Sequence, residues 1–440
     1  VHVPEILGRR VKVSTGYVEG SFPEDYFQVF YGYISGVTSR SGLVTIQLSD
    51  PGFKKRQQLF FQAKTKLTSP ISNVQTTIPV ASTSDFHQLI SSPGGVDSTA
   101  QLFLKIDDEF IEYTNGTTGP SSFSSVTRGC LGSVGVPHNI GAEVAAYLQI
   151  ESQGVPLALK LMLSGWNGYW TTGEPIYSIV NTTFPSIGNI EDAIILPQHV
   201  DAVAGYGLVV GDWVTITGAS NPANNVTTIA IAGFQDLYGQ PNRVILLEAG
   251  SGLVAEVGTS GTLSFRSKYD TLPVSCGLRM TPQDVDVARH EYYSNVFLTQ
   301  TDNSFRFLVS SPASGKEFIE SQIYLPLGAY SVTRRGRLAM NLARPPLPDE
   351  SLQFITSDEV LNPQDLAPTR ATNSRKFFNQ VNCDYDYNSN GAAESVVRTL
   401  DSESLSLIGV LSVLPITSQG GRTDKGAALM FQRRARQFLS

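Results

Sequence analysis

Four carboxylates lie within residues 107–112, and their types and spacing bear on acid–base chemistry. The four are Asp107, Asp108, Glu109 and Glu112. A pair of carboxyl groups flanking a glycosidic bond is the usual machinery of polysaccharide hydrolysis. On an alternating strand, however, Asp107 and Glu109 lie on one face while Asp108 and Glu112 lie on the other. We therefore keep a cell-wall polysaccharide hydrolase as the least favoured alternative and expect a non-enzymatic protein without catalytic residues.

A second set of oxygen-bearing side chains follows the alternate-position pattern of a calcium loop. The set is Asp386, Asn388, Asn390 and Glu394. Gly391 stands at the sixth position, as such a loop requires, but Val397 stands at the twelfth, where a bidentate Glu belongs. A strand that ends in an Asn-Gly hairpin turn is therefore favoured over a calcium site, and we expect no bound metal.

The remaining residues with chemical potential are scattered. The chain of 440 residues has five His and three Cys, all widely spaced, and contains no phosphate-binding, dinucleotide or HExxH motif. These observations predict no cofactor. A net charge of −7 disfavours a general nucleic-acid binder. No apolar run reaches the ~20 residues of a membrane helix, and the first residues lack the features of a signal peptide, so we expect no stable membrane insertion.

The elements that must position these residues are mostly short strands. Charged residues make up 16% of the chain, and the 39 Gly and 24 Pro punctuate many period-2 segments. We expect strands in residues 9–14, 27–34, 43–48, 101–113, 124–128 and 142–150. More strands are expected between residues 211 and 265, as in a small β-barrel. The fold class predicted is mainly β with a few helices (α+β).

Three segments have helical periodicity instead. Residues 155–165 begin with a Pro and end with a Gly, and residues 314–325 begin with Ser314 as a cap and end at Pro326 and Gly328. The amphipathic residues 424–439 predict a terminal helix. A hairpin over residues 329–342 and strands at 375–386 and 396–398 complete the C-terminal part.

Residues 106–144 form the most distinctive stretch of the sequence. A strand pair ends in a tight Arg128-Gly129-x-x-Gly132 turn, and His138 and Gly141 set the return into the next strand. Arg128 can reach back to a carboxylate, Glu109 or Glu112. We interpret these residues as architectural, because their polar groups pin turns rather than face a substrate.

This stretch resembles a module that recurs in structural proteins of tailed bacteriophages. The matching residues are Ile106, Asp107, Glu109, Ile111, Tyr113 and Thr114, then Thr127, Arg128, Gly129, Gly132, His138, Gly141 and Val144. Ser133 stands where the module usually has Thr. The resemblance implies a phage tail or capsid accessory protein.

Two further regions resemble phage baseplate or tail-tip hub proteins. The opening strands over residues 7–50 are similar to the first barrel of that family. Residues 316–338 and 378–387 are similar to its second hub region. The resemblance implies two hub-type β-barrel or sandwich domains and an inserted small β-barrel domain. The expected boundaries are a first hub domain at 1–150, a helix and aromatic connector at 151–180, the insertion at 181–268 and a second hub region at 269–440.

The resemblance also implies a role and partners. Hubs of this type form homotrimers that adapt the sixfold tail tube to a threefold tip or spike at the distal end of the tail in the virion. The implied partners are further copies of the chain, the tail tube or a distal tail protein, a spike or tip protein and the tape-measure protein. Genome DNA would pass only in transit.

Aromatic residues supply the candidate interface. Phe27, Tyr31 and Tyr33 share one strand face, in a stretch with enough aromatic residues to serve both a core and an interface with a neighbouring subunit. Trp166, Tyr169 and Trp170 follow the predicted helix, where they form either a core cluster or a sugar platform. The alternatives left open are a distal tail ring and a receptor- or carbohydrate-binding tail protein.

The insertion expected at 181–268 carries a prediction of its own. Deletion of residues 181–267 should leave the hub regions folded.

Overall fold

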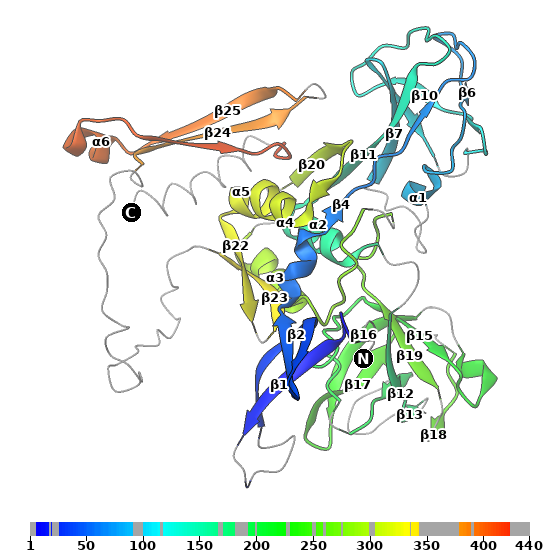
Figure 1. Ribbon diagram of the computed structural model, residues 1–440, viewed down its shortest axis with the longest axis vertical. Helices are drawn as coiled ribbons and strands as arrows, with labels where there is room; N and C mark the ends of the chain where they lie inside the picture. Colours follow the sequence, from blue (N-terminus) through cyan, green and yellow to red (C-terminus); the bar gives the residue numbers. More distant parts are fainter. Residues whose placement is uncertain are drawn as a thin grey trace.

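The protein is described by a computed structural model, in which the chain extends into separate lobes (Figure 1). The residues described are 6–16, 19, 26–90, 100–114, 118–165, 170–180, 192–198, 200–225, 229–248, 252–257, 261–273, 276–298, 304–334, 336–342, 378–388 and 391–422. Strands in several sheets outnumber helices among them, which confirms the predicted mainly-β α+β class. The predicted terminal helix at 424–439 lies outside these residues.

A six-stranded antiparallel sheet forms the upper lobe in Figure 1. Its order is β10-β8-β7-β11-β20, and β5 pairs with the start of β11. The bounds are β5 Lys64–Lys66, β7 Ala100–Ile106, β8 Glu109–Tyr113, β10 Thr127–Cys130, β11 Glu143–Gln153 and β20 Ser304–Val309. Asp107, with a φ of 50°, turns β7 directly into β8. Strand β20 joins this sheet from a distant part of the sequence, so the sheet is completed by residues beyond the first predicted domain.

Two pairs of very short strands and one short helix lie outside this sheet. Two-residue strands pair β6 (Ile78–Pro79) with β9 (Ser122–Phe123), and β4 (Gln58–Leu59) with β21 (Ala313–Ser314). Helix α1 spans His87–Ile90. The β4–β21 pair is a second link between the N-terminal third of the chain and residues after 300.

Helix α2 (Gly154–Leu163) lies at the centre of the molecule, where the sequence predicted a helix. All of its residues except Pro156 and Lys160 are buried, because elements pack around it on every side. Helix α3 (Val287–Val296) contacts it, and Asp286 caps α3 by accepting a hydrogen bond from the Arg289 N–H. Helix α2 therefore acts as a core element rather than a connector.

The helix predicted over residues 314–325 forms in three parts. These are α4 (Gly315–Glu317), the π-helix η5 (Phe318–Tyr324) and α5 (Leu325–Leu327). Pro326 does not end the helix as predicted. It lacks an N–H, and its ring crowds the carbonyl one turn earlier, which favours the wider π turn before it. Gly328, with a φ of 69°, is the residue that ends it. The predicted hairpin follows as β22 (Ala329–Arg334) and β23 (Arg337–Leu342).

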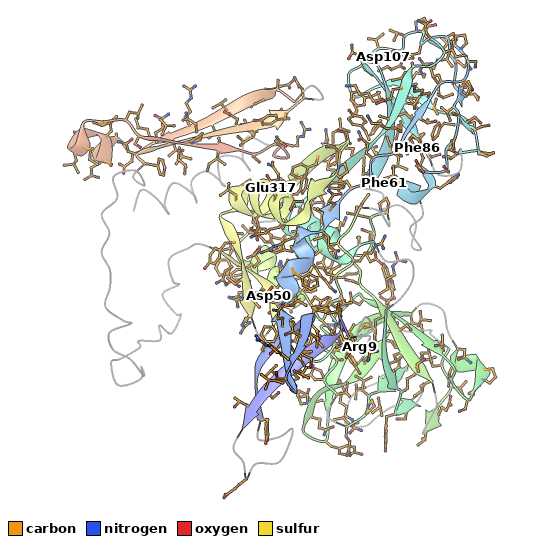
Figure 2. All side chains as sticks on the ribbon, viewed as in Figure 1. Arg9, Asp50, Phe61, Phe86, Asp107 and Glu317 are labelled. Atoms are coloured by element: carbon orange, nitrogen blue, oxygen red, sulfur yellow. The ribbon has the colours of Figure 1, made fainter. Side chains whose placement is uncertain are left out.

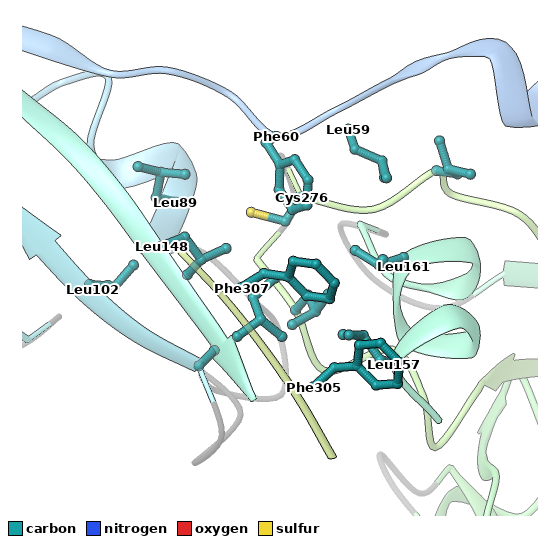
Figure 3. Packing of buried hydrophobic residues seen from close by; sticks show 14 of the residues in the cluster. Leu59, Phe60, Leu89, Leu102, Leu148, Leu157, Leu161, Cys276, Phe305 and Phe307 are labelled. Atoms are coloured by element: carbon teal, nitrogen blue, oxygen red, sulfur yellow. The ribbon is translucent and has the colours of Figure 1, made fainter. Parts of the chain in front are cut away.

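One hydrophobic core joins the six-stranded sheet to these helices (Figure 3). Residues from four distant segments meet in it, and examples are Phe60, Leu148, Leu161, Cys276 and Phe305. Burying each large apolar side chain contributes ~1.5–3 kcal/mol. The domain boundary predicted after residue 150 falls inside β11, and residues 59–163 share their core with residues 272–340. The division into a first and a second hub domain is corrected accordingly.

The insertion has a core of its own. Its strands run in the order β12-β19-β15-β16-β17-β14-β13-β18. The bounds are β12 Trp170–Pro175, β13 Ser178–Val180, β14 Ala193–Ile195, β15 Trp213–Thr217, β16 Ile229–Leu237, β17 Gln240–Leu247, β18 Glu256–Val257 and β19 Thr262–Arg266, with the 3-10 helix η3 at Pro222–Asn224. Their buried residues form a separate cluster. The unit thus begins with β12, earlier than the predicted start at residue 181.

Two small sheets extend from the body at different places (Figure 1). The N-terminal sheet consists of β1 (Arg10–Gly16), β2 (Tyr26–Arg40) and β3 (Leu43–Ser49), and the 3-10 helix η1 (Pro51–Arg56) leads from it into the body. The C-terminal sheet has the order β25-β24-β26, with β24 Gln380–Tyr387, β25 Ala393–Leu400, α6 Ser402–Ile408 and β26 Val413–Thr417.

These two sheets differ from the predicted hub barrels. In the described residues the strands of 1–150 fall into separate sheets, and the N-terminal one is an open three-stranded sheet. The apolar residues of 100–150 pack against segments after 272 instead of against β1–β3, which leaves the tip of the N-terminal sheet exposed. Closure into a barrel is therefore absent from this part of the described chain.

Candidate functional site

Glu109 is the centre of the phage-like module. Its carboxylate, with the side chain buried at the start of β8, accepts hydrogen bonds from Arg128 Nε at 2.6 Å and Arg128 Nη2 at 2.7 Å. It also accepts from the N–H groups of Gly129 and Val136, each at 3.1 Å. His138 lies between two carboxylates, with Nε2 2.8 Å from Glu109 Oε2 and Nδ1 2.8 Å from Asp107 Oδ2. Of the two predicted carboxylates, Glu109 is the one that Arg128 binds.

Arg128 has no donor left for a substrate. Beyond Glu109, its Nη1 donates to the carbonyls of Ser72 and Gln75, and its Nη2 donates to the carbonyl of Val136. All five guanidinium N–H groups are thereby engaged. The cluster cross-links four backbone segments at the far end of the six-stranded sheet, where Asp107 is labelled in Figure 2.

The electrostatics fit a permanent cross-link. Burial alone would raise the pKa of Glu109, but hydrogen bonds from Arg128, His138 and the Val136 N–H lower this pKa from 4.5 to about 2. A carboxyl group that stays ionised and fully bonded has no proton to give and no free lone pair to attack with. The hydrolase alternative gains no support from this geometry.

The module's glycines occupy turn positions. Gly129, Gly132 and Gly141 have φ values of 65°, 80° and 85°, which glycine adopts at little cost. A Cβ on Gly129 would also come within 3.1 Å of the Gly135 nitrogen. Ser133 takes the place of the module's usual Thr, and its hydroxyl accepts from the Phe110 N–H and donates to the Cys130 carbonyl. Each signature residue serves the turn geometry.

A second buried cluster was missed by sequence reasoning. Asp284 accepts hydrogen bonds from the Tyr33 hydroxyl, from Lys54 Nζ at 3.0 Å and from the Thr281 N–H at 3.1 Å. Arg10 Nη2 lies 3.7 Å from Asp284. Burial would raise the pKa of Asp284, but the charges of Lys54 and Arg10 outweigh it and lower that pKa. The one local signal was the Thr281-x-x-Asp284 spacing, typical of turn and cap motifs, since Tyr33 lies 251 residues away.

Two predicted interface residues are engaged within the chain. Tyr33 is 5% exposed, and its hydroxyl belongs to the Asp284 cluster, so this residue serves the core of the chain itself. Tyr31 is half-buried and packs against the β22–β23 turn, where a Cβ on Gly336 would clash with it. The side chains of Phe27, Trp166, Tyr169 and Trp170 lie outside the described residues.

The described residues of the weak calcium candidate include two that form other contacts within the chain. Asp386 forms an ion pair with Arg422 at 2.9 Å, and Asn388 Oδ1 accepts from the Ala392 N–H within the β24–β25 turn. Glu394 is exposed on β25, and Asn390 lies outside the described residues. Among described residues, no group of three or more His, Cys, Asp or Glu could hold a metal ion.

Exposed apolar residues mark two other candidate sites. On the N-terminal sheet, Leu43 is 72% exposed and Val44 59%, and the exposed cation Arg40 pairs with Leu43. The exposed cation Lys12 lies on β1, beside the other half of β2. On the C-terminal sheet and α6, the exposed apolar residues are Val396, Leu400, Leu407, Ile408, Val410 and Leu411. Around them lie the carboxylates of Asp384, Glu394, Asp401 and Glu403 with the cation Arg398. The two surfaces are thus apolar with opposite charge.

Comparison with known proteins adds no assignment. The sequence matches no protein-family model and no curated protein. In the described part of the chain, no helix combines the length and the hydropathy needed to span a bilayer.

Proposed function

We propose that the chain is a structural, non-enzymatic subunit of a bacteriophage tail tip or baseplate, present in the virion at the distal end of the tail. In this proposal three copies form a hub that adapts the sixfold tail tube to a threefold tip or spike. Its partners are further copies of itself, a tail-tube or distal tail protein, a spike or tip protein and the tape-measure protein, and DNA passes only in transit.

The observation that carries the proposal is the pair of exposed sheets with opposite charge. Contiguous apolar surface on a folded protein usually marks an interface. The N-terminal and C-terminal sheets are different surfaces at different ends of the molecule (Figure 1), so a contact between them joins two copies head to tail. Head-to-tail contacts that close generate rings. The resemblance of residues 106–144 to a module of tailed-phage structural proteins supports the same function, and its Glu109, Arg128 and His138 side chains are engaged in contacts within the chain.

Charge reversal tests this contact. We expect Lys12→Glu with Arg40→Glu to weaken self-association about tenfold or more, because like charges then face each other. Adding Glu394→Lys and Glu403→Lys to the same chain restores opposite charges and should restore association. Lys66→Glu, on β5, is the matched control and should have no effect. Association is measured by sedimentation across a concentration series. Failure of the combined variant to recover would contradict the head-to-tail contact.

A further inference from the structure

A polar cavity lies where the N-terminal sheet meets the body. Its volume is about 490 Å³, within the ~300–1,000 Å³ typical of ligand sites. It is bounded by the end of β3, by η1, by the α4–η5 helix and by β22. Figure 2 labels Asp50 and Glu317 at the η1 and α4 boundaries of this region. Neither the Glu109 cluster nor the Asp284 carboxylate lines this cavity.

A buried lysine supplies the floor of the cavity. The Lys55 side chain is 5% exposed, and its Nζ donates to Glu320 Oε1 and to Ser331 Oγ, each at 2.7 Å. An ammonium group has three N–H donors, so one remains for a ligand. Burial lowers the pKa of Lys55, and the nearby Lys316 charge lowers it further, whereas Glu320 and Asp50 raise it.

The other charges favour an anion. Arg56 and Lys316 line the cavity and have no hydrogen-bond or ion-pair partner among the described residues. The two carboxylates in the lining are already engaged, because Glu320 binds Lys55 and Asp50 caps η1 by accepting from the Gly52 N–H at 2.6 Å. The lining thus carries three cations and two carboxylates, a net charge of +1, around a polar space.

The backbone of β22 adds a second, independent feature. Ser331, Val332 and Thr333 are consecutive and all line the cavity. Successive side chains of a strand point to opposite faces, and Thr333 and its β23 partner Leu338 line the cavity from one face of the hairpin. The Val332 side chain belongs to the opposite face, so this residue lines the cavity from the edge of β22. In the described chain β22 pairs with β23 alone, which leaves its outer edge open. Such an edge can pair with an extended segment of another chain.

We propose that this cavity binds an extended, carboxylate-bearing peptide segment of a partner protein, which pairs with the β22 edge and places its acidic side chain near Lys55, Arg56 and Lys316. Backbone pairing supplies affinity, and the cationic pocket selects an acidic residue. The proposal rests on the cavity and the strand edge and holds independently of the phage assignment.

The test uses the full chain and a labelled peptide of about seven residues with alternating Val and Glu, a strand-length probe. Its Val/Gln counterpart and free glutarate are the ligand controls. We expect the Val/Glu peptide to bind about tenfold or more tightly than Val/Gln by fluorescence anisotropy. The variant Arg56→Glu with Lys316→Glu should lose that binding, whereas Lys66→Glu should retain it. Circular dichroism verifies that each variant is folded.

Amide hydrogen exchange supplies a readout of the strand edge. Bound peptide should slow exchange at residues 331–333, which an anion in the pocket alone would not do. Equal affinity for both peptides, equal loss in the Lys66→Glu variant, no detectable binding, or displacement of the peptide by equimolar glutarate would each overturn the proposal.

Discussion

At the scale of single residues, the buried carboxylates Glu109 and Asp284 make their polar contacts within the chain. Glu109 accepts five hydrogen bonds, and Arg128 uses all of its donors on the chain itself. Asp284 is enclosed in the same way by Tyr33 and two cations. Buried charges of this kind are strongly coupled to their partners, because removing one leaves the other desolvated without compensation. Their expected contribution is to stability.

Glu109→Gln should destabilise the protein by ~3–5 kcal/mol, because the Arg128 guanidinium then stays buried without its counter-charge. The matched control is Glu143→Gln, at an exposed ion pair with Lys64 at 2.8 Å, which should cost at most ~1 kcal/mol. Urea denaturation measures both. Equal losses of unfolding free energy in the two variants would contradict the prediction that the buried Glu109 contacts stabilise the fold more than the exposed Glu143 pair does.

The difference in stability between the wild-type protein and the Glu109→Gln variant depends on pH in a defined direction. The folded pKa of Glu109 is about 2, below its ordinary 4.5, so the ionised carboxylate stabilises the fold fully above pH 4.5. That stabilisation is lost as the pH falls toward 2. The stability difference between the wild-type protein and Glu109→Gln should therefore narrow in this window and stay constant above it.

At the scale of elements, the C-terminal sheet is attached to the body through a narrow contact. The Arg306 N–H donates to the Gly420 carbonyl at 2.8 Å, and Phe305 bridges to Gly421. A Cβ on Gly420 would lie 2.3 Å from the ring of Phe307. The sheet's own buried cluster is small, with Val381, Cys383 and Ile416. Its position therefore depends strongly on this glycine contact.

Gly420→Ala should loosen the C-terminal sheet while the main core stays folded. We expect faster amide exchange in residues 380–417 and unchanged exchange in α2. Gly391→Asn, at a turn position with open space and a φ of 79° that Asn tolerates, is the control and should leave both regions unchanged. Unchanged exchange in Gly420→Ala would show that the sheet is held elsewhere.

Elements differ in how far the sequence alone predicts them. Local patterns predict α2 and the β22–β23 hairpin, because Pro, Gly and apolar periodicity act within a few residues. The Glu109–Arg128 contact could be predicted from the sequence for the same reason, because the two residues are only 19 positions apart. The pairing of β11 with β20, which joins Glu151 to Arg306, has no local signal. The predicted domain boundary after residue 150 failed at β11 because its partner strand is distant in the sequence. The Asp284 cluster was missed for the same reason, since its residues are also far apart in the sequence.

At the scale of the whole molecule, the insertion is a separable unit. Its entry and exit are adjacent, since Ser164 Oγ donates to the Tyr269 carbonyl at 2.8 Å and the Gly165 N–H donates to Asp270. Most of its buried residues form their own cluster, while Val209 packs in the main core and the Val203 carbonyl accepts from Arg337. The deletion predicted for 181–267 should therefore begin before β12, which pairs with β19 at the end of the unit.

Replacement of residues 167–267 by a short flexible linker should leave the main core folded. We expect a single cooperative thermal transition and retained protection from exchange in α2. The matched comparison is deletion of 181–267, which leaves β12 without its partner β19 and should be the less soluble protein. An insoluble product from the longer deletion would contradict the separability of the insertion.

We propose that the chain assembles with threefold symmetry through two unlike surfaces. The most direct measurement is the native mass of the purified full chain, followed by particle symmetry in negative-stain images. We expect a trimeric mass and ring-shaped particles with threefold symmetry. A monodisperse monomer at high protein concentration, or a sixfold ring, would contradict it.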